Sequence, residues 1–141
     1  MRRQQSKSVV FLTELLLALM IFALCASTCA SLFGWAHRIS KESSELSQAV
    51  VAAQSGAEAF KAISSQDGLA AAVQGTIEGS ICLVGYDDDW KVSKLADASY
   101  IMQIHFSEED ILRRASISVL HQTGEIIYAL EATALYTEGR S

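Results

Sequence analysis

A long apolar segment covers residues 9–36, near the start of the chain. Its one charged residue is Glu14, and residues 15–36 form a run of 22 positions without a formal charge. A helix needs about 20 such residues to cross the hydrocarbon core of a bilayer. The pattern therefore predicts a membrane-spanning helix with a single carboxylate near one end.

The composition of this segment outweighs the glutamate. Residues 9–36 include 13 Val, Leu, Ile or Phe residues, and each favours insertion by about 0.3 to 0.6 kcal/mol. Their sum, on the order of 6 kcal/mol in favour of insertion, exceeds the cost of roughly 3 kcal/mol for one acidic residue at the centre of a membrane helix. We therefore expect the segment to insert. A carboxylate inside a membrane segment is also, by default, a functional residue.

Beyond the apolar segment, the hydrophobic positions recur with helical spacing. The stripe consists of Ile39, Leu46, Val50, Ala53, Ala57 and Phe60, and such spacing indicates an amphipathic helix. The chain contains no proline, so the same helix is predicted to continue to about residue 63. Ser64, Ser65, Asp67 and Gly68 should end it. We expect the stripe to pack on the remainder of the chain.

The remainder has strand character. Segments rich in β-branched and aromatic residues predict four main strands, at 80–86, 100–106, 115–121 and 125–136, with a short edge piece within 90–94. In the third, Ile117 and Val119 should share one face. Turn signals lie at 87–89 and 122–124, and 68–73 should be a short link, either helical or irregular. The predicted class is α+β, a long helix packed on a small antiparallel sheet.

The expected organisation has four parts. Residues 1–8 form a basic stub, 9–36 the membrane helix, 37–64 its amphipathic continuation and 65–141 a small sheet domain. Arg2, Arg3 and Lys7 precede the apolar segment without an acidic residue among them. The positive-inside rule then favours a cytoplasmic amino terminus and an external carboxy-terminal domain in a single-pass protein of the inner membrane. The alternative interpretation is a cleaved secretory signal, although the apolar segment is long for one.

A family resemblance follows from this order of features. The residues Phe11-Leu-Thr-Glu14-Leu-Leu-Leu-Ala-Leu, preceded by a basic stub and followed by an amphipathic helix and a small sheet, resemble the amino-terminal signature of type IV pilins and type II secretion pseudopilins. In that family a leader is cleaved after a glycine, and a glutamate lies four residues beyond the first mature residue. In this chain the first mature residue would be Val10, and Val9 stands in place of the glycine. The resemblance is thus to a divergent member.

The resemblance implies a function. Glu14 and Phe11 would take part in helix pairing, Arg2, Arg3 and Lys7 would form the leader, and Val9 and Val10 would flank the processing junction. The protein would be a minor subunit of a type IV pilus, a competence pseudopilus or a type II secretion pseudopilus. Its partners would be the lipid bilayer, other pilin-like subunits and an assembly platform. The alternative is a single-pass membrane protein whose external domain binds or scaffolds something without polymerising.

Other candidate chemistry is sparse. Cys25 and Cys29 are one helical turn apart in the apolar segment, where they could serve small-residue packing, a helix–helix contact or palmitoylation. Cys82 lies in a predicted strand and is expected to be a buried thiol, with an intermolecular disulfide as the alternative. Asp87, Asp88 and Asp89 form a turn rather than the spaced ligands of a calcium loop. The residues from Glu108 to Arg114 are predicted to form an exposed connection.

No motif points to catalysis. His37, His105 and His121 lack the spacing of metal ligands, and the sequence contains no nucleophile–base motif and no phosphate-binding loop. The net charge is −5, and no basic patch indicates contact with nucleic acid. We therefore expect a protein that is not an enzyme and has no cofactor or metal.

Overall fold

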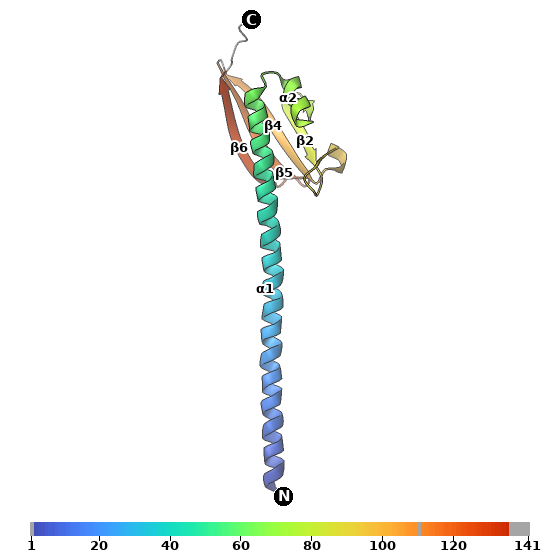
Figure 1. Ribbon diagram of the computed structural model, residues 1–141, viewed down its shortest axis with the longest axis vertical. Helices are drawn as coiled ribbons and strands as arrows, with labels where there is room; N and C mark the ends of the chain where they lie inside the picture. The colour runs from blue at the N-terminus through green and yellow to red at the C-terminus, as the bar shows by residue number, and fades with distance from the viewer. Residues whose placement is uncertain (1, 110, 136–141) are drawn as a thin grey trace. The chain divides into compact units, whose positions relative to one another are not determined.

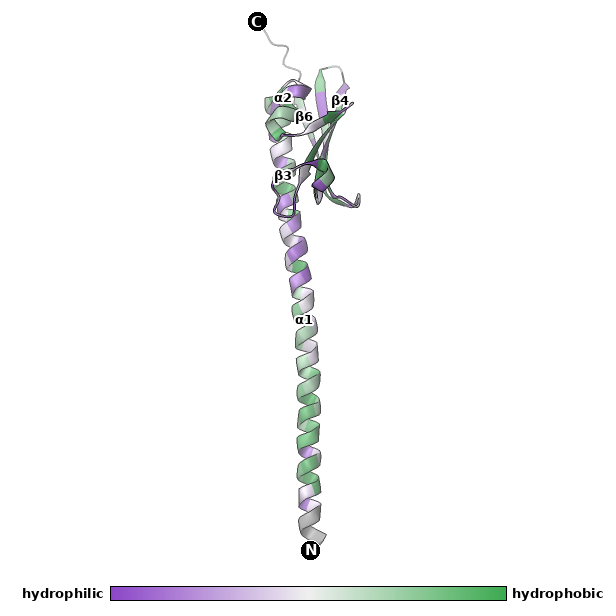
Figure 2. Cartoon of the chain, turned by 90° about the vertical axis from the view of Figure 1, so that its right-hand side faces the viewer, coloured by the Kyte–Doolittle hydropathy of each residue, from purple (hydrophilic) through white to green (hydrophobic). Residues whose placement is uncertain are grey.

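The computed structural model describes residues 2–109 and 111–135, with side chains from Ser6 onward. The chain divides into two compact units, Met1–Glu42 and Ser43–Ser141. A single helix, α1 (Arg2–Ala62), runs through both (Figure 1). It begins seven residues before the predicted start at residue 9 and ends one residue before the predicted end at residue 63. Figure 2 shows the hydrophobic positions concentrated along the first half of α1.

The second unit is an antiparallel sheet with helical cover. After α1 come α2 (Gln66–Val73) and a 3₁₀ turn, η1 (Leu95–Asp97). The strands are β1 (Thr76–Glu78), β2 (Ile81–Tyr86), β3 (Val92–Ser93), β4 (Tyr100–Glu109), β5 (Leu112–His121) and β6 (Ile126–Leu135). Their order is β1-β2-β4-β5-β6, and β3 pairs with β2. The predicted α+β class is confirmed, with six strands in place of about four.

The strand predictions were mostly accurate. The four main strands appear as β2, β4, β5 and β6, and the short edge piece appears as β3. The predicted link at 68–73 is helical, because Ser65 caps α2 by accepting a hydrogen bond from the Gly68 amide at 3.1 Å. Strand β1 was missed because it is three residues long and lies between two glycines. Tyr136, the last residue of the predicted fourth strand, lies outside the described residues.

The core lies between α1 and one face of the sheet. Ile117 and Val119 are fully buried on this face, as predicted. The other buried members come from α1, α2 and the four strands β2, β4, β5 and β6: Ala49, Ala52, Ala53, Ala57 and Phe60; Leu69; Cys82 and Val84; Met102 and Ile104; Ala115 and Ala132. Cys82 is a buried free thiol, and burial raises its pKa. This thiol is therefore shielded from oxidation and exchange in the folded state.

The packing face of α1 differs from the predicted stripe. Ala53, Ala57 and Phe60 are buried as expected, but Leu46 is 46% exposed and Ile39 is 45% exposed. The face that meets the sheet is made mainly of alanine and glycine. At Gly56 a Cβ atom would lie 3.1 Å from the Met102 sulfur. Small side chains let the helix backbone approach the sheet closely, and that proximity rather than residue hydrophobicity selects the buried face.

The predicted exposed connection from Glu108 to Arg114 was wrong. Strand β4 continues through Glu109, and β5 begins at Leu112. Glu108 is paired with Arg113 across the two strands. Arg113 points to the core face and is only 8% exposed. Charge density suggested a solvated loop here, but alternation along β5 places every second residue inward, including this arginine.

Candidate functional site

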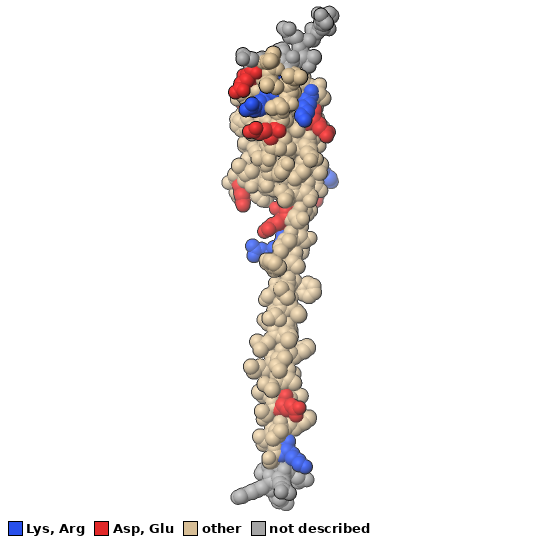
Figure 3. Space-filling model, turned by 90° about the vertical axis from the view of Figure 1, so that its left-hand side faces the viewer, with Lys and Arg blue, Asp and Glu red and all other residues tan. Residues whose placement is uncertain are grey.

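The apolar segment of α1 is exposed on all sides within its own unit. Every described residue from Ser6 to Lys41 is solvent-exposed in the structure, including Phe11 at 66% and Leu16 at 69%. By length and composition this helix is able to cross a membrane, and none of its most apolar stretch is buried against the protein. Figure 3 shows a long uncharged surface along this part of α1. A helix that is apolar all round requires a nonpolar environment or a protein partner.

Hydroxyl groups within this segment are satisfied by the helix itself. Thr13 donates to the Val9 carbonyl at 2.8 Å, and Thr28 donates to the Cys25 carbonyl at 2.8 Å. Ser31 donates to the Ser27 carbonyl at 3.0 Å. Such bonds to the preceding turn let hydroxyl side chains enter an apolar environment without a separate partner. The outer surface of the segment is therefore less polar than its composition suggests.

Glu14 differs from these hydroxyl residues. Among the described residues, no side chain forms a hydrogen bond or ion pair with its carboxylate. Phe11 lies one turn before it and is exposed, as are Val9 and Val10 at the predicted processing junction, which is helical. Lys7 is exposed two turns before Glu14. Arg2 and Arg3 belong to α1, but their side chains lie outside the described residues.

Two cysteines face outward from the same segment. Cys25 and Cys29 are both exposed free thiols. Cys29 also lines a shallow apolar groove with Leu32, Phe33 and Ala36 on the helix surface. These thiols are therefore accessible to whatever surrounds the helix, in contrast to the buried Cys82.

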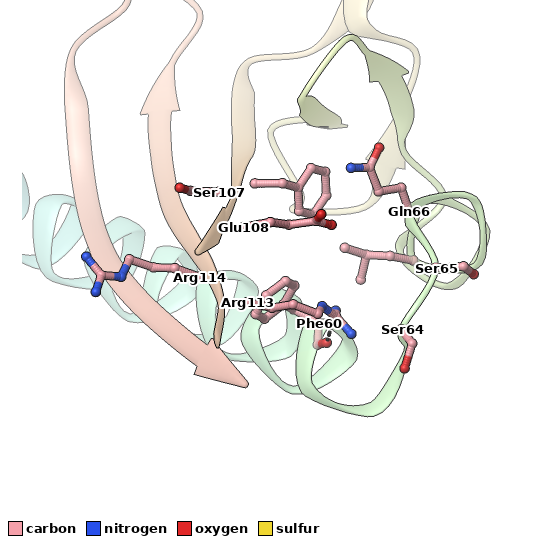
Figure 4. Close-up of a pocket in the computed structure, with 10 residues that line it drawn as sticks. Phe60, Ser64, Ser65, Gln66, Ser107, Glu108, Arg113 and Arg114 are labelled. Atoms are coloured by element: carbon pink, nitrogen blue, oxygen red, sulfur yellow. Dashed lines mark hydrogen bonds between the residues drawn. The ribbon is translucent and has the colours of Figure 1, made fainter. Parts of the chain in front are cut away.

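A small cavity lies at the carboxy-terminal end of α1, in the second unit (Figure 4). Its volume of about 10 Å³ is room for roughly one water molecule. The walls include Phe60, Leu69, Phe106 and Arg113. A cavity of this size excludes a small-molecule substrate, whose pockets are of the order of 300 Å³ or more.

Arg113 caps the end of α1 beside this cavity. Its Nη2 donates to the Phe60 carbonyl at 3.0 Å and to the Ile63 carbonyl at 2.8 Å. The guanidinium also lies 4.7 Å from the centre of the Phe60 ring. Carbonyls at a helix carboxy terminus have no intrahelical partner and carry partial negative charge, so a cation there is favoured. Through these contacts the arginine stabilises the junction of helix and sheet.

A cluster of polar and aromatic side chains lies at the other end of the sheet. The Tyr100 hydroxyl donates to Glu45 Oε1 at 3.0 Å, and His121 Nε2 lies 3.7 Å from Glu45 Oε2. Tyr100 and His121 are direct cross-strand partners on β4 and β5. Their ring centres are 5.2 Å apart. The cluster therefore joins α1 to two central strands through one carboxylate.

Trp90 completes the cluster. Its ring stacks on Tyr100, with centres 4.2 Å apart and planes 15° from parallel. The Trp90 backbone has a positive φ of 60°, a conformation that costs a non-glycine residue about 1 to 2 kcal/mol. Aromatic stacking, worth about 0.5 to 1.5 kcal/mol beyond burial, offsets that strain. The turn that contains Trp90 is organised by Asp87, whose Oδ1 accepts from the Asp89 and Lys91 amides at 2.9 Å each.

The acidity of Tyr100 reflects this environment. Burial, together with the hydrogen bond to Glu45 and the negative charges of Glu45 and Asp88, raises the pKa of Tyr100 to about 12. The phenol therefore stays protonated and keeps donating to Glu45 at any physiological pH. The cluster was missed from the sequence because its members are 55 and 76 residues from Glu45 along the chain, and no local spacing relates them.

Comparison with known proteins identified no relative. No family model matches the chain, and no curated protein and no solved structure is similar to it. Among the described residues, no group of three or more His, Cys, Asp or Glu side chains is placed to hold a metal ion. The structure by itself defines the class: an α+β protein with an exposed apolar amino-terminal helix and a small antiparallel sheet.

Proposed function

We propose that this protein is a pilin-like membrane subunit, a minor component of a type IV pilus, a competence pseudopilus or a type II secretion pseudopilus, that assembles through its apolar amino-terminal helix. The observation that supports the proposal most directly is the all-round exposure of residues 9–36 in α1. A surface of this size and composition is unstable in water. Lipid before assembly, and neighbouring apolar helices after it, would both cover it.

The flanking charges support a defined position in the bilayer. Lys7 and Arg38 bound the segment and are 31 residues apart, or about 46 Å along an α-helix. That length is close to the roughly 40 to 45 Å of a bilayer with its headgroups. With Lys7 at the cytoplasmic surface of the inner membrane, Glu14 lies about 10 Å deeper, and the carboxy-terminal unit is external.

At that depth Glu14 requires neutralisation. A buried charge is tolerated when it is paired and hydrogen-bonded, or when it is protonated. Since the described residues of its own chain offer no partner, a basic group on a neighbouring subunit is the natural one. Lys7 of an adjacent copy, shifted along the helix axis, presents such a group. Pairing of this kind would fix the register between adjacent helices.

Substitution of Glu14 tests the proposal. Two differently tagged copies are co-expressed, and capture of one through the other is measured in mild detergent. We expect Glu14→Ala and Glu14→Gln to reduce capture about fivefold or more, because polar contacts between membrane helices contribute about 1 to 2 kcal/mol. Glu58→Gln is the matched control, since Glu58 is an exposed glutamate on the same helix outside the apolar segment.

Membrane integration is measured separately on the same variants. Every variant should remain in the membrane pellet after extraction with alkaline carbonate, because removing a carboxylate favours insertion. Release of the wild-type protein would contradict membrane anchoring itself. Capture that is unchanged in the Glu14 variants would contradict assembly through this residue.

A second function has one specific observation in its favour. Val9 stands where the family has the glycine that permits cleavage, which favours a single-pass protein that keeps its leader and presents an external binding or scaffolding domain without polymerising. Mass spectrometry of the amino terminus from cells separates the two. A mature chain beginning near Val10 supports the pilin-like subunit, and an intact leader supports the alternative.

A further inference from the structure

The carboxylate of Glu45 connects the helix and the sheet at one end of the second unit. Tyr100 is the first residue of β4 and His121 is the last residue of β5. Both side chains contact Glu45, which is near the start of the α1 portion in this unit. These contacts therefore hold the first turns of that portion against the end of the sheet at which β4 begins and β5 ends.

The two contacts respond differently to pH. The Tyr100 hydroxyl is a neutral donor, and its 3.0 Å hydrogen bond persists across the physiological range. The distance from His121 Nε2 to Glu45 Oε2 is 3.7 Å, which is longer than a hydrogen bond. Attraction across this distance depends on charge, so it is present when the imidazole is protonated and weak when it is neutral. Histidine is the side chain that changes charge between about pH 5 and 8.

We propose that Glu45, Tyr100 and His121 form a pH-sensitive latch that holds α1 on the sheet more tightly when His121 is protonated. The tyrosine keeps the carboxylate in place at every physiological pH, and the histidine adds an ion pair as the pH falls. The side chains of His121 and Glu45 are 32% and 16% exposed, so protons reach the imidazole from solvent without unfolding. The latch lies in the sheet-bearing unit and does not depend on the proposed assembly function.

Other charged groups lie beside the cluster, and all of them are lysines or carboxylates. They are Lys41 and Glu42, which precede Glu45 in the sequence, Asp88 in the β2–β3 turn, whose charge acts on Tyr100, and Glu125 after the β5–β6 turn, whose backbone carbonyl accepts from the His121 amide at 2.8 Å. Lysine and carboxylate side chains keep their charges between about pH 5.5 and 7.5. Within that window a change at this end of the sheet is attributable to His121.

Hydrogen exchange of the full chain in detergent micelles tests the latch. Amide exchange in peptides that cover residues 43–50 is measured at about pH 5.5 and 7.5 and corrected for the intrinsic pH dependence of exchange. We expect protection to be about two- to fivefold greater at the lower pH, the range given by partly exposed ion pairs. Peptides from the centre of β4 and β5 report on global stability in the same samples.

Two variants remove the pH dependence in different ways. Glu45→Gln keeps an oxygen that can accept from Tyr100 but removes the charge, and His121→Gln removes the titrating group. Both should show equal protection at the two pH values. His105→Gln is the matched control, because His105 is exposed on the opposite face of the sheet and should leave the pH effect intact.

The outcomes separate the latch from a purely structural contact. A structural role alone would lower protection in the variants equally at both pH values. The proposal is overturned if wild-type protection at residues 43–50 does not change with pH, or if Glu45→Gln retains the full change. A variant that loses near-ultraviolet circular dichroism has lost the packing around Trp90 and Tyr100, and the other variant then decides the question.

Discussion

The buried guanidinium of Arg113 offers a sharp test of how the helix and sheet are joined. Replacing Arg113 with alanine removes the hydrogen bonds to the Phe60 and Ile63 carbonyls and the contact over the Phe60 ring. It also leaves two carbonyls at the end of α1 without these donors. The neighbouring residue, Arg114, is on the opposite face of β5, and its side chain is 47% exposed. The two adjacent arginines form a matched pair.

The magnitude follows from these contacts. Hydrogen bonds that involve a charged group contribute about 1.5 to 3 kcal/mol each, and a cation over an aromatic ring contributes about 0.5 to 2 kcal/mol. Desolvation of the guanidinium offsets part of this gain, so Arg113→Ala should lower the free energy of unfolding by about 3 kcal/mol. Arg114→Ala removes an exposed pair with Glu109 at 3.8 Å and should cost less than about 1 kcal/mol.

Chemical denaturation of the full chain in detergent measures both variants, with the near-ultraviolet circular dichroism of the sheet-bearing unit as the signal. Arg113→Lys should recover only part of the loss, because an ammonium group lacks the planar fork that reaches two carbonyls. Equal destabilisation by the Arg113 and Arg114 variants would refute the capping role. So would an Arg113→Ala protein as stable as the wild type.

Three further predictions concern other parts of the chain. Ala49→Leu should destabilise the protein by about 1 to 3 kcal/mol by overpacking, because Ala49 is fully buried although it lies outside the predicted stripe, whereas Leu46→Ser should cost little because Leu46 is 46% exposed. Denaturation of the two variants would give the reverse order if the hydrophobic stripe were the packing face. The stability of the protein should fall as pH rises from about 10 to 12. The pKa of Tyr100 is about 12 in the folded state, so the folded state holds the phenol proton more tightly than the unfolded chain does. The proton therefore contributes its full stabilisation below about pH 10 and loses it as the pH rises. Thermal unfolding should show a shallower fall in Tyr100→Phe, while an unchanged slope would contradict the burial of this phenol. Mild oxidation of membranes should link two copies through Cys25 or Cys29, which are exposed, and not through Cys82, which is buried. Absence of wild-type dimers on non-reducing gels would contradict helix pairing in this segment, and dimers that persist in the Cys25→Ser, Cys29→Ser double variant would contradict the burial of Cys82.

Local patterns in the sequence were sufficient to predict the long helix and the four main strands. The uncharged stretch from Leu15 to Ala36 and the absence of proline predict one long helix, and α1 has that form. Alternation around Ile117 and Val119 predicts the inward face of β5. These features depend on side chains a few residues apart, so the local sequence is enough to predict them.

The packing face of α1 was decided by tertiary structure. Leu46 is a larger hydrophobic residue than Ala49 or Ala52, yet the alanines are buried and the leucine is half exposed. Close approach of the helix to the sheet favours small residues, because a Cβ atom at Gly56 would lie 3.1 Å from the Met102 sulfur. Hydrophobic periodicity predicts a helix, but it does not predict how closely that helix packs on the sheet.

The polar contacts of the second unit were likewise decided by the fold. Arg113 belongs to a charged run that suggested an exposed loop, and Glu45 and His121 are separated by most of the sheet domain. Strand pairing brings Tyr100 beside His121, and helix packing then brings Glu45 to both. The sequence by itself determined the apolar helix and the strands, because local periodicity encodes them. Only the tertiary structure decided which charges are buried and paired, because that depends on groups brought together from distant parts of the chain.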